Sequence, residues 1–558
     1  MELTNNYNSY KKYVSDYESW RDKQDLAQLR RLSYLKQHPD KMNSADIERG
    51  KSLLHAIDVM DEYSQANAED MEVATEFATG QIVGLATMIG MFLGLPFSQS
   101  KGIKALAAKL AKNNKFGIDA IVGMVPSIIG MFIGLAASFP AVVWSTKAQI
   151  SASRKGRFEA MRKDLNNPAN FAVLTPDQRK QAEELSKTIE LEDRDKKRIE
   201  QRKGLGANPF TAFKTLKKYF SEDGEFSKQK AEFDKKLKER EKQFDTTLSS
   251  EQVKNAKRDQ QILSEMVRRM DIASQDYAEN TELATNTLTT LALGTGGLVG
   301  WASNKLLKLM KISSNNKFAK FIPWVVGAAI PLVMGIYSAQ VQKHASRIGR
   351  FKVRQDMLNN PASFVYVEDS EAAKMSDVKL PKRQKKPNIF KFFIQLLKDN
   401  KEYQQYRKNK SLEELKFHKA LEQIELTPEQ LKEAKTLQAN VFNTFNKVDE
   451  KSQAYSESVE AIGEIAKQGV STFGSLGAMA VSTLMMINMC KNPEAIRKAG
   501  VVKTVAKTML PFAFMLLPVI LIDIYTTKAQ KKASRVADML ALKELEDYRH
   551  YADYGTNG

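Results

Sequence analysis

Histidine is the side chain best suited to acid–base chemistry and metal binding near neutral pH, and this chain contains five. They stand far apart, and none belongs to a paired metal-ligand spacing. No phosphate-binding glycine loop of the Walker or dinucleotide type occurs in the required context. We therefore predict a protein that is not an enzyme and holds no cofactor or metal. The five histidines are His38, His55, His344, His418 and His550.

Another set of polar residues recurs three times at one spacing, and we call this pattern the stripe. Its members are separated by steps of three, four, eight and eleven residues, which return to one side of a helix. Three copies in the same order indicate an internal repeat. The stripes are Asp61, Ser64, Gln65, Glu69 and Glu72; Asp271, Ser274, Gln275, Glu279 and Glu282; and Asp449, Ser452, Gln453, Glu457 and Glu460.

A basic motif closes each repeat, and we call it the exit motif. Its copies are Gln149, Ala152, Ser153 and Arg154; Gln342, Ala345, Ser346 and Arg347; and Gln530, Ala533, Ser534 and Arg535. An antiparallel hairpin would place each exit motif beside its own stripe, where arginine can bind a carboxylate through two hydrogen bonds. We predict three structural Glu–Arg pairs: Glu69 with Arg154, Glu279 with Arg347, and Glu457 with Arg535. The alternative is independently solvated charges, whose pairs would contribute about 0–1 kcal/mol.

Between the stripes and the exit motifs lie runs that contain no Asp, Glu, Lys or Arg. About 20 apolar residues in a helix span the roughly 30 Å hydrocarbon core of a bilayer. The runs predict an all-α integral membrane protein with six transmembrane helices, paired as three hairpins. The alternative is a large soluble helical protein with uncharged core helices, which a mean hydropathy of -0.41 favours. The runs are residues 77–100, 120–146, 283–304, 321–342, 468–490 and the shorter 509–522.

Small residues four positions apart within these runs support close helix packing in lipid. Examples are Gly80 with Gly84, and Gly130 with Gly134. The repeats divide the chain into an N-terminal helical segment, three membrane hairpins and two charged helical linkers that resemble coiled-coil sequences. The boundaries are 1–60 (N-terminal segment), 61–173 (hairpin), 174–260 (linker), 261–366 (hairpin), 367–438 (linker) and 439–558 (hairpin and tail).

The net charge of +19 first suggests nucleic acid as a partner, but the positive residues border the charge-free runs. Anionic lipid headgroups explain that distribution more simply. The first twenty residues lack the apolar run of a cleavable signal. Placing the termini and linkers in the cytoplasm requires translocation of only three short loops, so we expect a multi-pass protein of that orientation, in the cell membrane if the source is bacterial. The charged linkers are candidate sites for protein partners.

Both linkers contain a stretch where aromatic and aliphatic residues alternate with lysines at helical spacing. Such a helix suits the headgroup plane of a membrane, although the same face could pack on the protein's own helices. Later in each linker, Ser249 and Thr427 each have Gln three residues on, which predicts capping boxes. The membrane-surface candidates are Phe210, Phe213, Lys217 and Phe220 in the first linker, and Phe390, Phe393 and Leu397 in the second.

Three short motifs predict helix ends. Asn-Asn-Pro occurs at 166–168 and again at 359–361. Proline disfavours helical backbone angles at the residue before it. The tetrad His38 to Lys41 resembles the His-Pro-Asp loop with which J-domain co-chaperones engage their chaperone partner. The Leu-Gly motif expected in the preceding helix is absent. The alternative is a Pro-Asp helix break followed by a new helix.

Three two-helix repeats also form the plan of the mitochondrial carriers, which makes transport a hypothesis. The carrier signature couples a proline in the odd helices to an acidic and a basic residue downstream, and this sequence lacks it. The recurring prolines instead fall in the second helix of each hairpin. We therefore expect a non-catalytic membrane scaffold or membrane-organising protein. The alternative is a transporter or channel with a pathway between the hairpins.

Overall fold

The computed structural model describes residues 2–61, 151–193, 225–239, 249–309, 344–367, 389–450 and 525–545, some with short gaps, together with isolated positions between these ranges. The architecture is all-α, and the described residues include no strand. Among the described helices, none is both long enough and apolar enough to cross a membrane. One predicted span, 283–304, lies on a described helix, whereas the other five fall largely outside the described residues.

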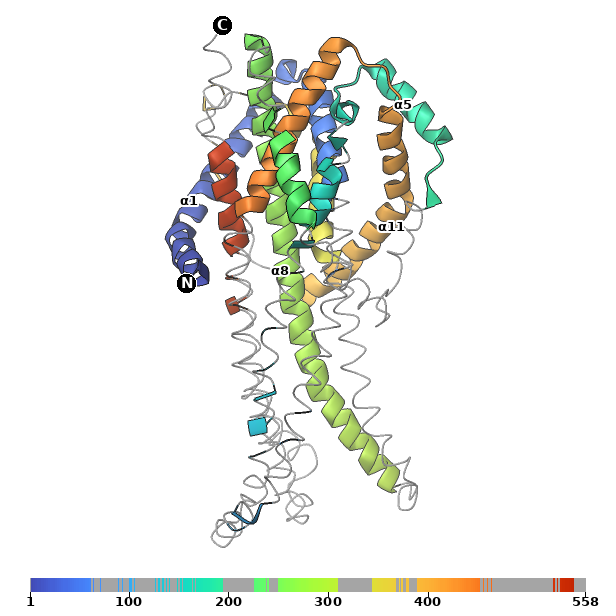
Figure 1. The fold of residues 1–558 in the computed structure, drawn as a ribbon. Helices are drawn as coiled ribbons and strands as arrows, with labels where there is room; N and C mark the ends of the chain where they lie inside the picture. Colours follow the sequence, from blue (N-terminus) through green and yellow to red (C-terminus); the bar gives the residue numbers. More distant parts are fainter. Residues whose placement is uncertain are drawn as a thin grey trace.

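Three helices carry the leading aspartates of the stripes, and we call them the stripe helices. They are residues 44–61, α8 (Ser250–Leu309) and residues 428–451. Three others follow the exit motifs, and we call them the exit helices: residues 151–164, 344–359 and 532–545. The 60-residue α8 runs through the helical body and continues well beyond it (Figure 1).

Three helix ends have nearly the same backbone geometry. His38, Asn167 and Asn360 have φ of -124°, -127° and -126°, and each precedes a proline that starts a short 3-10 helix. Proline cannot continue the helix hydrogen bonding and restricts the residue before it. The predicted helix ends are therefore confirmed. The 3-10 helices are η1 (Pro39–Lys41), η2 (Pro168–Phe171) and η3 (Pro361–Phe364).

The remaining described helices cover the stripe and exit helices. α1 (Glu2–Gln37) packs against η3, and α11 (Ile389–Leu421) packs against both α5 (Pro176–Thr188) and α8. The predicted capping box at Thr427 is confirmed. The backbone N–H of Gln430 donates to the Thr427 hydroxyl at 3.2 Å, and the backbone N–H of Thr427 donates to Oε1 of Gln430 at 3.1 Å. This box fixes the start of the third stripe helix.

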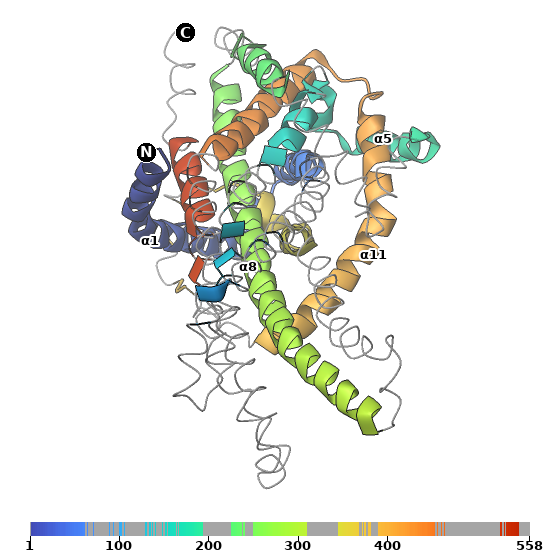
Figure 2. The same cartoon turned by 60° about the horizontal axis from the view of Figure 1, so that its bottom comes forward.

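The main hydrophobic core joins all three repeats. It contains Leu53 and Ile57 of the first stripe helix, Met266 of α8 and Phe442 of the third stripe helix, all almost fully buried. A second cluster joins the ends of the chain, where Tyr17 and Trp20 of α1 pack on the last exit helix. That exit helix, drawn in red, lies between α1 and α8 in both views (Figures 1 and 2). Burial of each large apolar side chain contributes roughly 1.5–3 kcal/mol.

The stripe and exit helices of the second repeat lie side by side. A Cβ added at Gly349 would meet the Ala273 carbonyl oxygen at 2.3 Å, so the two backbones approach too closely for any larger residue. One turn away, the hydroxyls of Ser274 and Ser346 are 2.5 Å apart. This contact joins a stripe residue to its own exit motif, as the hairpin geometry requires.

Candidate functional site

Six equivalent positions from the three repeats converge where the stripe and exit helices meet. Each stripe contributes its leading aspartate, and each exit helix contributes the residue three positions after its recurring arginine. In the first two repeats that residue is arginine, and in the third it is Asp538. We call this set the inter-repeat ring: Asp61, Asp271, Asp449, Arg157, Arg350 and Asp538.

The first exit helix bonds to the third stripe helix. Arg157 donates to both carboxylate oxygens of Asp449, with an Nε to Oδ2 distance of 3.2 Å. Both side chains are largely buried. The two planar groups therefore form a bidentate ion pair between the first and last repeats.

The second exit helix bonds to the first stripe helix and to its own. Arg350 donates through one nitrogen to Asp61 and through another to Asp271, the latter at 2.5 Å. Burial alone would lower the pKa of Arg350, but the charges of Asp61 and Asp271 outweigh it and raise that pKa. A single guanidinium thus joins the first two repeats.

The third exit helix bonds to the second stripe helix. Arg535 pairs with Asp276, and the Gln275 amide donates to Ser534 at 2.8 Å and to Asp538 at 2.9 Å. The contacts consequently run from repeat 1 to repeat 3, from repeat 2 to repeat 1, and from repeat 3 to repeat 2. The three repeats close into a circle.

The inter-repeat ring contains more negative than positive charge. Four carboxylates face two guanidiniums, and all four aspartates are at least nine-tenths buried. Burial, with neighbouring aspartates, raises the pKa of Asp271 against the opposing effect of Arg350. Burial and the charge of Asp271 raise the pKa of Asp538 well above its ordinary value. The ring therefore favours a proton on at least one carboxylate.

The predicted site residues have different outcomes. Asp61, Asp271, Asp449 and Gln275 all lie in or against the ring, whereas Gln65 and Gln453 lie outside the described residues. The residues that the sequence reasoning missed are Arg157, Arg350 and Asp538. Their fixed offset of three residues from the exit arginines was the signal that could have found them.

The three Glu–Arg pairs remain predictions. Glu69 and Glu457 lie outside the described residues, and Arg154 is partly buried in its exit helix. Glu279 and Arg347 are both buried. Arg535 forms an ion pair with Asp276 of the second repeat, so this arginine joins the third repeat to the second.

The membrane-surface candidates are partly described. Phe210, Phe213, Lys217, Phe220 and the side chains of Phe390 and Phe393 lie outside the described residues. In α11, the neighbouring Phe392 and Leu396 pack against Ile348 and Phe351 of the second exit helix, whereas Leu397 is exposed. One face of this segment therefore packs on the protein, and another faces outward.

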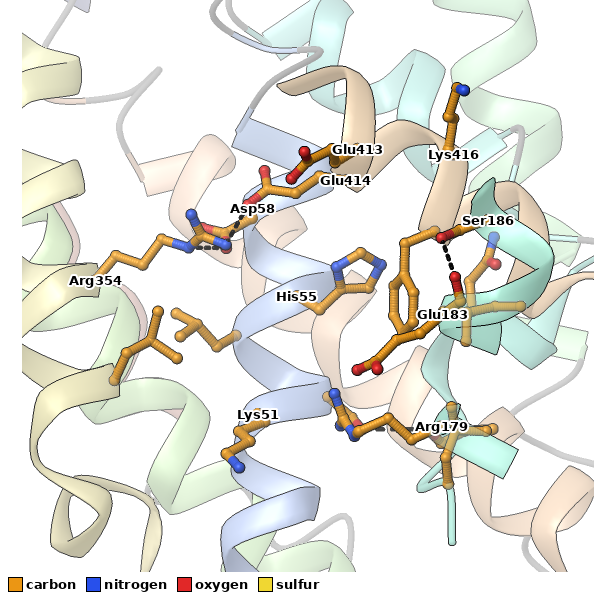
Figure 3. A pocket seen from close by; sticks show the side chains of 18 of the residues that line it. Lys51, His55, Asp58, Arg179, Glu183, Ser186, Arg354, Glu413, Glu414 and Lys416 are labelled. Carbon is orange, nitrogen blue, oxygen red and sulfur yellow. Dashed lines mark hydrogen bonds and ion pairs between the residues drawn. The ribbon is translucent and has the colours of Figure 1, made fainter. Parts of the chain in front are cut away.

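A cavity of about 760 Å³ is lined by residues of the same stripe and exit helices, one helical turn from Asp61 and Arg350 of the ring. Figure 3 shows this cavity. Its walls come from the first stripe helix, η2 and the chain after it, α5, the second exit helix and α11. Charged side chains of both signs line its walls, and apolar residues lie between them. The lining includes Lys51, Leu54, His55, Asp58, Asn170, Arg179, Glu183, Ser186, Arg354, Glu414, Lys416 and Phe417.

One wall of the cavity is a three-membered ion cluster. The Arg354 guanidinium is 2.5 Å from a carboxylate oxygen of Asp58 and 2.5 Å from one of Glu414 (Figure 3). Burial raises the pKa of Asp58 to about 7, although Arg354 opposes this effect, and the charges of Glu414 and Asp61 add to it. A carboxyl group with that pKa exchanges protons near neutral pH.

His55 lies next to Asp58 on the same helix and faces the cavity (Figure 3). Its ring centroid is 5.6 Å from those of Phe417 and His418, so two histidines far apart in sequence meet in space. Burial, together with His418 and two arginines, lowers the pKa of His55 to about 3. Its Nε2 is buried and makes no hydrogen bond within the described part of the chain.

Comparison with known proteins gives no relative from which a function could be inferred. No protein-family model, no curated protein and no solved structure matches the chain. A functional proposal for this chain therefore rests on its own sequence and structure.

Proposed function

We propose that the protein is a non-catalytic multi-pass membrane protein that acts as a scaffold or membrane organiser. The observation that carries this proposal is exposed aliphatic surface on the first predicted hairpin. Ile89 and Leu93 are 57% and 65% exposed, and Ile129 and Ile133 are 52% and 66% exposed. Each pair is four residues apart, so each lies on one face of its helix.

A neighbouring face of the second helix supports the same proposal. Gly130 and Gly134 follow the exposed isoleucines by one residue and are buried. Small residues pack inward while large aliphatic residues face outward, which is the arrangement of a helix that packs through glycine and contacts lipid tails. In water, exposed apolar area would cost about 25 cal/mol per Å². Lipid is therefore the partner that this surface fits.

The scaffold role follows from the closed arrangement of the repeats. The inter-repeat ring holds three hairpins together at one end, and the charged linkers offer surface to protein partners. The Lys and Arg residues around the charge-free runs suit anionic lipids. We propose that the termini and linkers lie in the cytoplasm, and that the membrane is the cell membrane if the source is bacterial.

Spin-label accessibility tests insertion directly. A nitroxide is attached at Ile129→Cys or Ile133→Cys in full-length protein carrying Cys490→Ser, reconstituted in lipid. We expect strong relaxation by oxygen and weak relaxation by a water-soluble reagent. Leu380→Cys is the matched control, because Leu380 is also exposed but lies outside every charge-free run. Equal accessibility of positions 129 and 380 to the water-soluble reagent would contradict insertion.

A transporter or channel is the second candidate, and one observation favours it. The inter-repeat ring places ionisable groups where all three repeats meet, which is where a pathway between the hairpins would begin. Ion and proton flux into liposomes that contain the purified protein distinguishes the two candidates. A scaffold gives the flux of empty liposomes, and a transporter gives flux above that level.

A further inference from the structure

We propose that the cavity is the port through which protons exchange between solvent and the inter-repeat ring, with Asp58 as the exchanging group. This inference goes beyond the scaffold proposal and does not depend on membrane insertion. In this proposal the ligand of the cavity is the proton, and the charge of the ring changes with pH.

The geometry connects the cavity to the ring through two successive layers of ion pairs. Asp58 and Asp61 are one turn apart on the first stripe helix, and Arg350 and Arg354 are one turn apart on the second exit helix. Asp61 pairs with Arg350 in the ring, and Asp58 pairs with Arg354 in the cavity wall. The same two helices therefore carry carboxylates continuously from the cavity to the ring.

The six residues of the ring carry more negative than positive charge, which a bound proton would offset. Asp61, Asp271, Asp449 and Asp538 face Arg157 and Arg350, while Arg535 is bonded to Asp276. The hydrogen bond of Asp538 comes from the neutral amide of Gln275. Because buried like charges repel strongly, protonation of one carboxyl group removes an unfavourable charge.

Asp58 is suited to deliver that proton. The groups that face it are Arg354 from the exit helix, Glu414 from α11, and Asp61 and His55 from its own helix. Arginine stays protonated and acts as a fixed charge. Transfer breaks the O–H bond of protonated Asp58 and forms one on a ring carboxylate, which leaves Asp58 as the anion. Asp58 then takes a new proton from water in the cavity.

Proton uptake by the purified full-length protein tests the proposal. After a drop from about pH 8 to about pH 6, an indicator dye reports how many protons each chain binds and how fast. We expect Asp58→Asn to bind about one proton fewer per chain than the wild type. Glu183→Gln is the matched control, because Glu183 also lines the cavity but is exposed. That control should bind as many protons as the wild type.

A second variant blocks the port and leaves the ion pairs intact. Ser186→Cys, in a chain that also carries Cys490→Ser, places a thiol on the cavity lining for a bulky maleimide. We expect the labelled protein to lose the fast phase of proton uptake that the unlabelled variant retains. Uptake that is equally fast in both would overturn the proposal, as would wild-type uptake by folded Asp58→Asn. If Asp58→Asn does not fold, the labelling result decides alone.

Discussion

At the scale of single residues, buried charge is the dominant feature of this molecule. An exposed ion pair contributes little, whereas removing one member of a buried pair leaves the other charge in a poorly solvating environment. The ring residues belong to the second class, because both the arginines and the aspartates are largely shielded from water. Their substitution should therefore affect folding far more than substitution of surface charges.

Arg350 should be among the most sensitive positions. Arg350→Met leaves Asp61 and Asp271 without their shared cation, and we expect a loss of about 3–5 kcal/mol in the free energy of unfolding. Denaturant unfolding of the purified protein measures this loss. Arg269→Met is the control, because the side chain of its partner Asp356 is 66% exposed, and it should cost no more than about 1 kcal/mol. Similar losses for the two variants would show that burial does not determine the effect.

Asp538 should make stability depend on pH. Its pKa is raised in the folded state, so the folded chain binds more protons than the unfolded chain at pH values above the ordinary 3.8. Stability is then fully present below that value and falls as the pH rises. Asp538→Asn cannot ionise, and we expect a smaller decrease in Tm than for the wild type between about pH 5 and about pH 8. Parallel Tm curves for the two proteins would contradict this prediction.

At the scale of elements, close helix contact holds the stripe and exit helices of the second repeat together. The contact between α8 and the second exit helix depends on the missing side chain of Gly349. The exit helices also carry a recurring alanine, and Ala152, Ala345 and Ala533 are all buried. Small residues on the exit helices thus set the distance at which the polar groups of the ring can meet.

Enlarging Gly349 should separate these helices. Gly349→Ala places a methyl group against the Ala273 backbone, which has no flexible side chain to move aside. We expect a loss of about 1–3 kcal/mol in stability, measured by thermal or denaturant unfolding. Gly102→Ala is the matched control, because a Cβ there meets nothing within 4 Å. An equal loss of stability in Gly102→Ala would show that close helix packing does not explain the effect of Gly349→Ala.

At the scale of the whole molecule, the ring joins the first repeat to the last. A protease site inserted after Leu380 would separate the third repeat from the first two in sequence. After cleavage, we expect the two fragments to stay together on size-exclusion chromatography, because Arg157 and Asp449 bond across them. Arg157→Asp should weaken this association, and adding Asp449→Arg should restore it. Failure of the reversed pair to restore association would show that this contact does not hold the repeats together.

The sequence predicted part of this arrangement. Periodicity located the stripes and the exit motifs, and proline motifs located the helix ends, since each depends on residues close in the chain. It could not show that Arg157 meets Asp449, because the neighbours of an exit helix depend on how three repeats pack around one another. The cavity was missed for the same reason, since His55 and His418 come from segments far apart. The six membrane spans and the Glu–Arg pairs remain predictions.

The circular order of contacts has a consequence for how such a chain could change in length. In an open repeat array, each unit touches only its neighbours, so copies can be added at either end. Here Arg157 of the first exit helix is already paired with Asp449 of the third stripe. A fourth copy would have no free place, and loss of one copy would leave an arginine facing an absent carboxylate. Gain or loss of a single repeat by gene duplication or deletion should therefore prevent the circle of contacts from closing. The geometry of these contacts thus fixes the number of repeats at three.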